Sequence, residues 1–167
     1  TVAVGDPNLE ETIIGPIINQ SQVKKHQQII QSAKEQGAEL VYEGGIEGNL
    51  VYPHIFTGVA PESPLAQEES FGPILPILKA HDEAHALKLA NDTRFGLSSA
   101  VCTSNIERGI HFTEQLDIGM THINGISVAD QANAPFGGEK NSGVGRFNGR
   151  WIFEEFTRTH WLTVPSE

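Results

Sequence analysis

The residues best suited to chemistry lie at positions 67–73, which read Gln-Glu-Glu-Ser-Phe-Gly-Pro. A carboxylate held on a stiff turn can accept two hydroxyl hydrogen bonds, as when a protein binds the ribose diol of a dinucleotide. An aromatic ring two residues later can pack on a flat heterocycle. The pattern suggests a nucleotide contact through Glu69 and Phe71. The alternative is a solvated acidic turn followed by a core phenylalanine, because charged clusters usually only face water.

A second notable stretch is the glycine-rich segment 134–147, with four glycines within nine residues. Glycines let a backbone adopt left-handed angles and approach another surface closely, which suggests a specific use. The spacing of Gly143, Gly145 and Gly149 does not fit the dinucleotide fingerprint, and no Gly-Lys-Ser/Thr triplet is present. We therefore expect no direct phosphate binding here.

A different chemistry is suggested by His81 and His85, whose imidazoles would share one helix face and could bind zinc. The zincin pattern requires glutamate beside the first histidine, but Asp82 stands there and is better suited to capping a helix. No third ligand is evident, so a zinc hydrolase remains only an alternative. The remaining histidines are expected to be ordinary surface or core residues; they are at positions 26, 54, 111, 122 and 160.

The composition limits the partners and the setting. The chain has 167 residues and a formal net charge of −10, which argues against a nucleic-acid partner. One cysteine cannot form an internal disulfide, and no apolar stretch approaches the ~20 residues of a membrane span. A cytoplasmic, non-membrane protein is expected. The sequence opens on Thr1 rather than Met, which suggests a piece of a longer protein.

Strands and helices alternate after residue 73. We expect strands over 74–79, 98–103 and 119–123, with helices over 82–91 and 106–115. This alternation indicates an α/β fold with an open, twisted, largely parallel sheet and crossover helices. Ligands of such sheets bind at the carboxyl ends of strands, so the loop after Ile123 is expected to form a binding wall.

Local signals predict the remaining boundaries. A helix capped by Asn19 or Ser21 should end near Gln36, before Gly37. Pro53 suggests an edge position for the extended segment 52–59, which follows a strand over 38–43. A Ser104-x-x-Glu107 capping box should start the helix at Ile106. A short helix over 148–156 and an apolar strand over 157–164 end the chain; such a strand invites pairing with another chain.

Four motifs stand at compatible spacings along the chain, namely Ile14-Gly15-Pro16-Ile17-Ile18, Glu68-Glu69-Ser70-Phe71-Gly72-Pro73, Asn91-Asp92 with Phe95-Gly96-Leu97, and Pro135-Phe136-Gly137-Gly138-x-Lys140-x-Ser142-Gly143-x-Gly145-Arg146. With these motifs the chain resembles the C-terminal part of NAD(P)-dependent aldehyde dehydrogenases over nearly its whole length. The loop 119–125 is similar to the branch that acts on benzaldehyde, salicylaldehyde and vanillin.

The resemblance implies roles for three residues. Glu69 would bind the hydroxyls of the nicotinamide-side ribose, and Phe71 would rest against the cofactor, NAD or NADP, near the nicotinamide. Phe136 would line the aldehyde pocket, with the loop 126–133 as a wall; plain core packing is its alternative. Residues 1–156 would be a partial catalytic domain, and residues 157–167 a strand that joins subunits of a homo-oligomer.

The resemblance also implies what this chain lacks. In the family a cysteine thiolate attacks the aldehyde, hydride passes to the nicotinamide, and a glutamate activates water. Both residues would lie upstream of position 14, and Cys102 is expected to be a small core side chain. No catalytic residue is therefore assigned here, and the chain alone is expected to be inactive. The competing interpretation is a non-catalytic domain that only packs and pairs.

Overall fold

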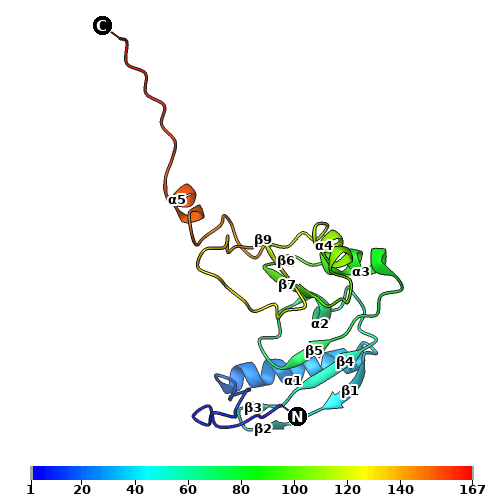
Figure 1. The fold of residues 1–167 in the computed structure, drawn as a ribbon. Helices are drawn as coiled ribbons and strands as arrows, with labels where there is room; N and C mark the ends of the chain where they lie inside the picture. Colours follow the sequence, from blue (N-terminus) through cyan, green and yellow to red (C-terminus); the bar gives the residue numbers. More distant parts are fainter. Residues whose placement is uncertain (1, 167) are drawn as a thin grey trace. The chain divides into compact units, whose positions relative to one another are not determined.

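The structure is a computed structural model that describes residues 2–166, so Thr1 and Glu167 lie outside the described residues. The chain divides into two compact units, Thr1–Ala86 and Leu87–Glu167, which are described separately below. Figure 1 labels their elements in chain order.

The first unit is built on the long helix α1 (Gln20–Glu35). Asn19 caps it by accepting a 2.9 Å hydrogen bond from the Gln22 N–H, as predicted. Gly37 follows the helix with a φ of 86°, a left-handed angle that suits a helix end. The buried side of α1 presents Val23, His26, Ile30 and Ala33.

A three-stranded sheet lies against α1, in the order β1 (Glu39–Glu43), β4 (His54–Thr57) and β5 (Ile74–Pro76). Strands β4 and β5 are parallel and are joined through the short helix α2 (Pro64–Gln67), whereas β1 and β4 are antiparallel. A small hairpin of β2 (Ile46–Glu47) and β3 (Leu50–Val51) lies between β1 and β4 in the sequence. The core of the unit consists of Ile30, Ala33, Phe56, Val59, Leu65 and Ile74.

The edge position predicted for the segment after Pro53 is wrong, because β4 is the central strand of this sheet. Pro53 lies one residue before β4, where its missing N–H removes no hydrogen bond between strands. The chain can therefore place a proline beside a central strand.

The second unit contains a parallel crossover. Strand β7 (Ser98–Val101) leads into α4 (Ile106–Thr113) and returns as β8 (Met120–Ile123), with Ser98 opposite Met120 and Val101 opposite Ile123. Short antiparallel strands β6 (Phe95–Gly96) and β9 (Glu139–Lys140) pair beside it. Helix α3 (Glu83–Asn91) spans the boundary between the units, and α5 (Trp151–Phe156) ends the ordered elements.

The α/β class is confirmed, but strand pairing departs from the single sheet expected. Strand β5 pairs with β4, and β7 pairs with β8 in a separate sheet. Hydrophobic patterning shows that a segment is extended, but it does not identify its neighbour. The predicted capping role of Ser104 is also wrong, because Asn105 caps α4 through a 3.0 Å hydrogen bond from the Arg108 N–H.

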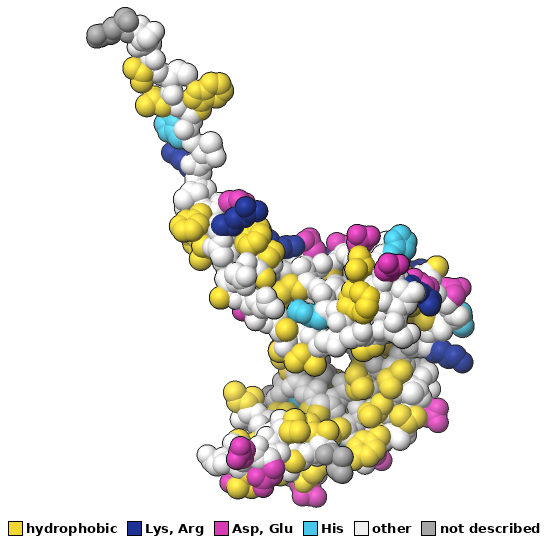
Figure 2. Space-filling view, in the orientation of Figure 1, with side chains coloured by type: hydrophobic (Ala, Val, Ile, Leu, Met, Phe, Trp, Pro, Cys, Tyr) yellow, Lys and Arg dark blue, Asp and Glu magenta, His cyan; other side chains and the backbone are white. Residues whose placement is uncertain are grey.

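The tail after α5 is open to solvent. Residues 157–166 form no strand within the described part of this chain. Trp161, Leu162 and Val164 are at least three-quarters exposed, and Figure 2 shows apolar side chains along this segment. Pairing of the tail with a second chain therefore stays a prediction. None of the helices in the described residues is both long and apolar enough to cross a membrane.

Candidate functional site

Glu69 and Phe71 lie on the loop that connects α2 to β5. Both side chains are exposed, and Phe71 retains 71% of its surface. No hydrogen bond or ion pair of the Glu69 carboxylate occurs among residues 2–166. The core position considered for Phe71 is thus wrong. A free acceptor and an open ring stand two residues apart, as a nucleotide contact would require.

Side chains of α1 hold the backbone of this loop through hydrogen bonds. The Ser70 carbonyl receives hydrogen bonds from His26 Nε2 at 2.9 Å and from Gln22 Nε2 at 3.1 Å. His26 has no exposed surface. Phe71 directly follows the anchored carbonyl and has a φ of 52°. Residues other than glycine adopt this left-handed angle only at a cost in conformational free energy. The loop is therefore fixed in one unusual conformation.

Phe136 lies in the second unit at the start of the glycine-rich segment. Its backbone pairs with Phe147 through two hydrogen bonds of 3.1 and 2.7 Å. The half-buried ring lines a cavity of about 310 Å³. The cavity is lined by residues from β8, the following loop and the segment around Phe136, namely Gly119, Met120, Thr121, His122, Ala129, Asp130, Gln131, Ala134, Pro135 and Phe136. Phe136 thus borders a cavity of the second unit.

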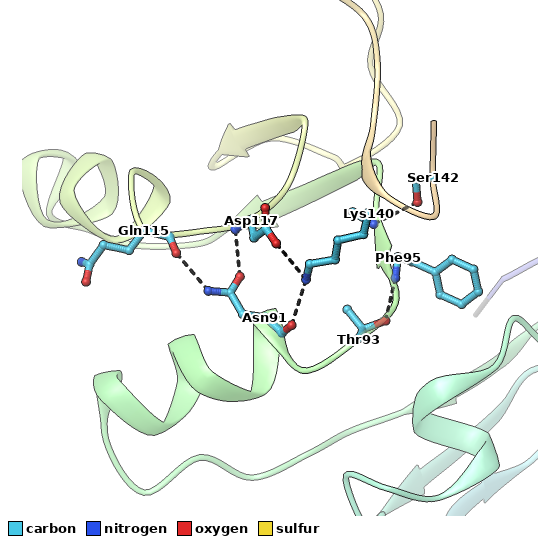
Figure 3. A network of polar contacts seen from close by, with 8 residues as sticks. Asn91, Thr93, Phe95, Gln115, Asp117, Lys140 and Ser142 are labelled. Atoms are coloured by element: carbon cyan, nitrogen blue, oxygen red, sulfur yellow. Dashed lines mark hydrogen bonds and ion pairs between the residues drawn. The ribbon is translucent and has the colours of Figure 1, made fainter. Parts of the chain in front are cut away.

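A polar network holds the middle of the glycine-rich segment (Figure 3). The Lys140 ammonium donates to the backbone carbonyl of Asn91 at 2.8 Å and lies 3.8 Å from the Asp117 carboxylate. The Asn91 amide donates to the Gln115 carbonyl at 2.9 Å, and its oxygen accepts from the Asp117 N–H at 2.9 Å. Lys140, itself in β9, thereby links the end of α3 to the segment before β8.

Further contacts explain the glycine-rich motif as a structural one. The Ser142 hydroxyl accepts a 2.9 Å hydrogen bond from the Gly96 N–H (Figure 3). The Arg146 guanidinium pairs with Glu139 and donates to the Gly138 carbonyl at 3.1 Å. Because Lys140 and Arg146 already contact backbone carbonyls and carboxylates, the segment has little to offer a phosphate.

His81 and His85 stack on each other, with ring centroids 4.7 Å apart. His85 Nδ1 accepts a 3.2 Å hydrogen bond from the His81 N–H, and the Asp82 carboxylate caps the helix at the His85 N–H. Within residues 2–166, no three His, Cys, Asp or Glu side chains come together as a metal site would need. The zinc alternative therefore gains no support.

Cys102 is exposed, so its predicted core position is wrong. Strand β7 ends at Val101, and the cysteine falls in the turn toward α4, where side chains are not enclosed by the sheet. The exposure follows from a strand that ends two residues earlier than expected.

Sequence reasoning missed His26, which was treated as one of several ordinary histidines. Its place on the buried stripe of α1 was visible, since it follows Val23 by three residues and precedes Ile30 by four. Its partner Ser70 lies 44 residues away, and no local pattern signals that contact. The roles of Asn91 and Lys140 were missed for the same reason.

Comparison with known proteins gives a consistent match. The sequence profile described as the aldehyde dehydrogenase family matches residues 1–162. The chain is 49% identical over 163 residues to a vanillin dehydrogenase of Corynebacterium glutamicum and 45% identical over 167 residues to a benzaldehyde dehydrogenase of Bacillus subtilis. These alignments cover 98% and 100% of this chain, and 34% of each relative.

Solved structures agree with the sequence comparison. A salicylaldehyde dehydrogenase from Pseudomonas putida, solved with salicylaldehyde, matches 99% of this chain and 35% of its own, with a TM-score of 0.92 and 37% identity. A NAD-dependent benzaldehyde dehydrogenase from Corynebacterium glutamicum matches 97% of this chain and 31% of its own, with a TM-score of 0.80 and 42% identity. The chain therefore spans about a third of the length of the relatives it matches.

Proposed function

The chain belongs to the aldehyde dehydrogenase family, and from this premise we propose that it is the C-terminal third of an NAD(P)-dependent enzyme. The enzyme oxidises an aldehyde, preferably an aromatic one, to the carboxylic acid. The preference is supported by the vanillin, benzaldehyde and salicylaldehyde dehydrogenases among its relatives. The single observation that carries the role of this chain is the anchored loop with the free Glu69 carboxylate and the exposed Phe71 ring.

This loop fits the nicotinamide half of the cofactor. The Glu69 carboxylate, which has no partner in the described chain, can accept hydrogen bonds from both hydroxyls of a ribose. The Phe71 ring can cover a flat heterocycle at a fixed offset from that sugar. When bound, the cofactor supplies the hydride acceptor; Glu69 and Phe71 bind and orient it.

Phe136 is proposed to line the aldehyde pocket, with the loop 126–133 as a wall. Its ring and Met120 give the cavity an apolar surface, while Thr121 and Gln131 add polar atoms at its border. Such a combination suits a flat ring that carries a polar substituent. Burial of the aromatic ring of the aldehyde against Phe136 would contribute most of the free energy of aldehyde binding.

The chain is proposed to contribute no nucleophile and no general base. By family resemblance both lie upstream, and Cys102 is an exposed residue in the turn that follows β7. The exposed apolar tail supports the proposal that residues 157–167 pair with another subunit in a homo-oligomer. A cytoplasmic setting is proposed from the single cysteine and the absence of a disulfide pair in the sequence.

The test compares the chain with the full-length enzyme of which it is proposed to be a part. The full-length enzyme should reduce NAD or NADP when supplied with benzaldehyde, whereas this chain alone should not. Absorbance of the reduced cofactor measures both. Turnover by the chain alone would contradict the placement of the nucleophile, and a full-length enzyme without aldehyde oxidation would contradict the proposed activity.

A further inference from the structure

We propose that His26 is a positioning residue for the cofactor. By holding the Ser70 carbonyl, it fixes the backbone on which Glu69 and Phe71 stand. This inference rests on the proposed function, because it assigns a residue outside the binding surface to the cofactor contact. His26 touches neither cofactor nor aldehyde in this role, and acts through the loop alone.

The first support is the hydrogen bond itself. His26 Nε2 lies 2.9 Å from the Ser70 oxygen, and the imidazole is fully buried. A carbonyl only accepts, so the ring proton lies on Nε2 and points at Ser70. Gln22 Nε2 approaches the same oxygen at 3.1 Å, which gives this carbonyl two donors from one helix. The two donors come from successive turns of α1, so the helix aims them together.

The second support is steric contact between the ring and the loop. A Cβ atom placed on Gly72 would overlap Cε1 and Nε2 of His26. The loop backbone therefore lies directly on the imidazole edge, and glycine is the residue that permits this approach. Ser70 also closes the turn, because its hydroxyl donates to the Gly72 carbonyl at 3.1 Å.

The third support is the conformation that the contact imposes. Phe71 lies between the two anchored residues with a φ of 52°. A non-glycine residue with a left-handed backbone conformation is strained, and it keeps that conformation only when the surrounding structure enforces it. Both ends of the loop are also fixed: the Glu68 N–H donates to Pro64, and the His54 N–H donates to the Pro73 carbonyl at 2.9 Å. His26 and Gln22 supply the restraint in the middle.

A residue that only filled this space could be replaced by an apolar side chain of similar volume, which defines the test. His26→Leu fills the site without a donor, whereas His26→Gln keeps an N–H at the reach of Nε2. In the full-length enzyme, loss of one hydrogen bond should raise the KM for the cofactor about 3- to 10-fold in His26→Leu. His26→Gln should stay near the wild-type value, and the KM for benzaldehyde should change little in either variant.

A double-mutant cycle with Glu69→Gln separates positioning from general damage. If His26 acts by placing Glu69, the cost of Glu69→Gln in cofactor KM should shrink in the His26→Leu background. Gln22→Met removes the second donor to the Ser70 carbonyl, from a side chain that is only partly buried. This variant should also raise the cofactor KM, and it keeps the test available if His26→Leu does not fold.

The outcomes are distinct. Additive effects of His26→Leu and Glu69→Gln, or equal cofactor KM values for His26→Leu and His26→Gln, would overturn the positioning role. An unchanged cofactor KM in Gln22→Met would also count against it. If Glu69→Gln alone leaves cofactor kinetics unchanged, the ribose assignment of the proposed function fails, whatever His26 does.

Discussion

The Lys140 ammonium donates a 2.8 Å hydrogen bond to the backbone carbonyl of Asn91, a residue 49 positions earlier in the chain. The lysine side chain keeps only 17% of its surface, so this donor is largely removed from water. The contact fastens the glycine-rich segment, with Phe136 near its start, to the end of α3. The glycine-rich segment, whose lysine and glycines are typical of anion-binding loops, thus connects β9 to the end of α3, a contact that we call the Lys140 clamp.

Replacing Lys140 by methionine should lower the free energy of unfolding by about 1 to 3 kcal/mol, because the Asn91 carbonyl loses its charged donor. The ion pair with Asp117 adds little, since that carboxylate is mostly exposed. Urea unfolding of the two proteins measures the difference. Lys79→Met, at an exposed site, is the matched control, and an equal loss in both variants would contradict the clamp.

Glu69→Gln in the full-length enzyme should raise the KM for the cofactor roughly 10-fold, because a neutral amide oxygen accepts ribose hydroxyl bonds more weakly than a carboxylate. Steady-state kinetics with varied cofactor at saturating benzaldehyde measures the change. Glu62→Gln removes a charge at another exposed position of the same unit and should leave the KM near wild type. Equal kinetics in both variants would argue against the ribose contact.

Phe136→Ala should reduce kcat/KM for benzaldehyde about 10-fold or more, since a buried aromatic contact contributes on the order of 2 kcal/mol. The effect on a small aliphatic aldehyde such as propanal should be weaker, because that substrate has no ring to cover. The ratio of the two kcat/KM values is the measurement. Phe153→Ala, at a ring that is 68% exposed, is the control. A parallel loss for both aldehydes would point to packing rather than to substrate contact.

Deleting residues 157–167 from the full-length enzyme should shift it toward monomers. The deletion removes the exposed apolar side chains of Trp161, Leu162 and Val164, which are proposed to contact another subunit. Size-exclusion chromatography with light scattering measures the mass. Arg158→Ala, a single exposed change in the same segment, should keep the oligomer. An unchanged mass after the deletion would show that another surface joins the subunits.

Asp6 offers a test of local electrostatics. The Asn8 N–H donates to its carboxylate at 2.9 Å and the Asn8 side-chain amide at 2.8 Å, and both lower the pKa of Asp6, the backbone donor most. A carboxyl whose pKa is lower in the folded than in the unfolded state stabilises the folded protein at pH values above the unfolded-state pKa. This stabilisation is lost as the pH falls through the folded-state pKa. In NMR titrations, Asn8→Ala should raise the pKa of Asp6 only partly, since the backbone donor remains. A complete return to the ordinary aspartate range would contradict this ranking.

Local chemistry made several parts of the fold predictable from sequence. Asn19 could be named, with Ser21, as a candidate cap because a cap side chain bonds a backbone N–H within its own helix turn; Asn19 accepts from the Gln22 N–H three residues ahead. The same logic failed at Ser104. The side chain of Asn124 bonds both the N–H and the carbonyl of Thr103 at 2.8 Å, and Asn124 lies 21 residues after Thr103. The Thr103 hydroxyl in turn accepts from the Asn105 N–H, which moves the cap by one residue.

The candidate site was predictable to a similar degree. Glu69 and Phe71 could be selected because residue type and spacing alone suggest what they present to a ligand. Their support could not be predicted, since it depends on His26 meeting Ser70 across 44 residues. Such long-range pairs leave no periodic signal in either segment. The structure therefore adds chiefly the residues that hold the loop rather than those that the loop displays.

The separation of Asn91 from Lys140 also has a consequence for synthesis. Asn91 leaves the ribosome 49 residues before the lysine that binds its carbonyl. At typical translation speeds, the interval is roughly 2 to 10 seconds. The nascent chain can complete the β7–α4–β8 crossover in that time, but the end of α3 waits for its ammonium donor. A pause in translation before the codon for Lys140 would lengthen the stage at which a chaperone can still bind this region.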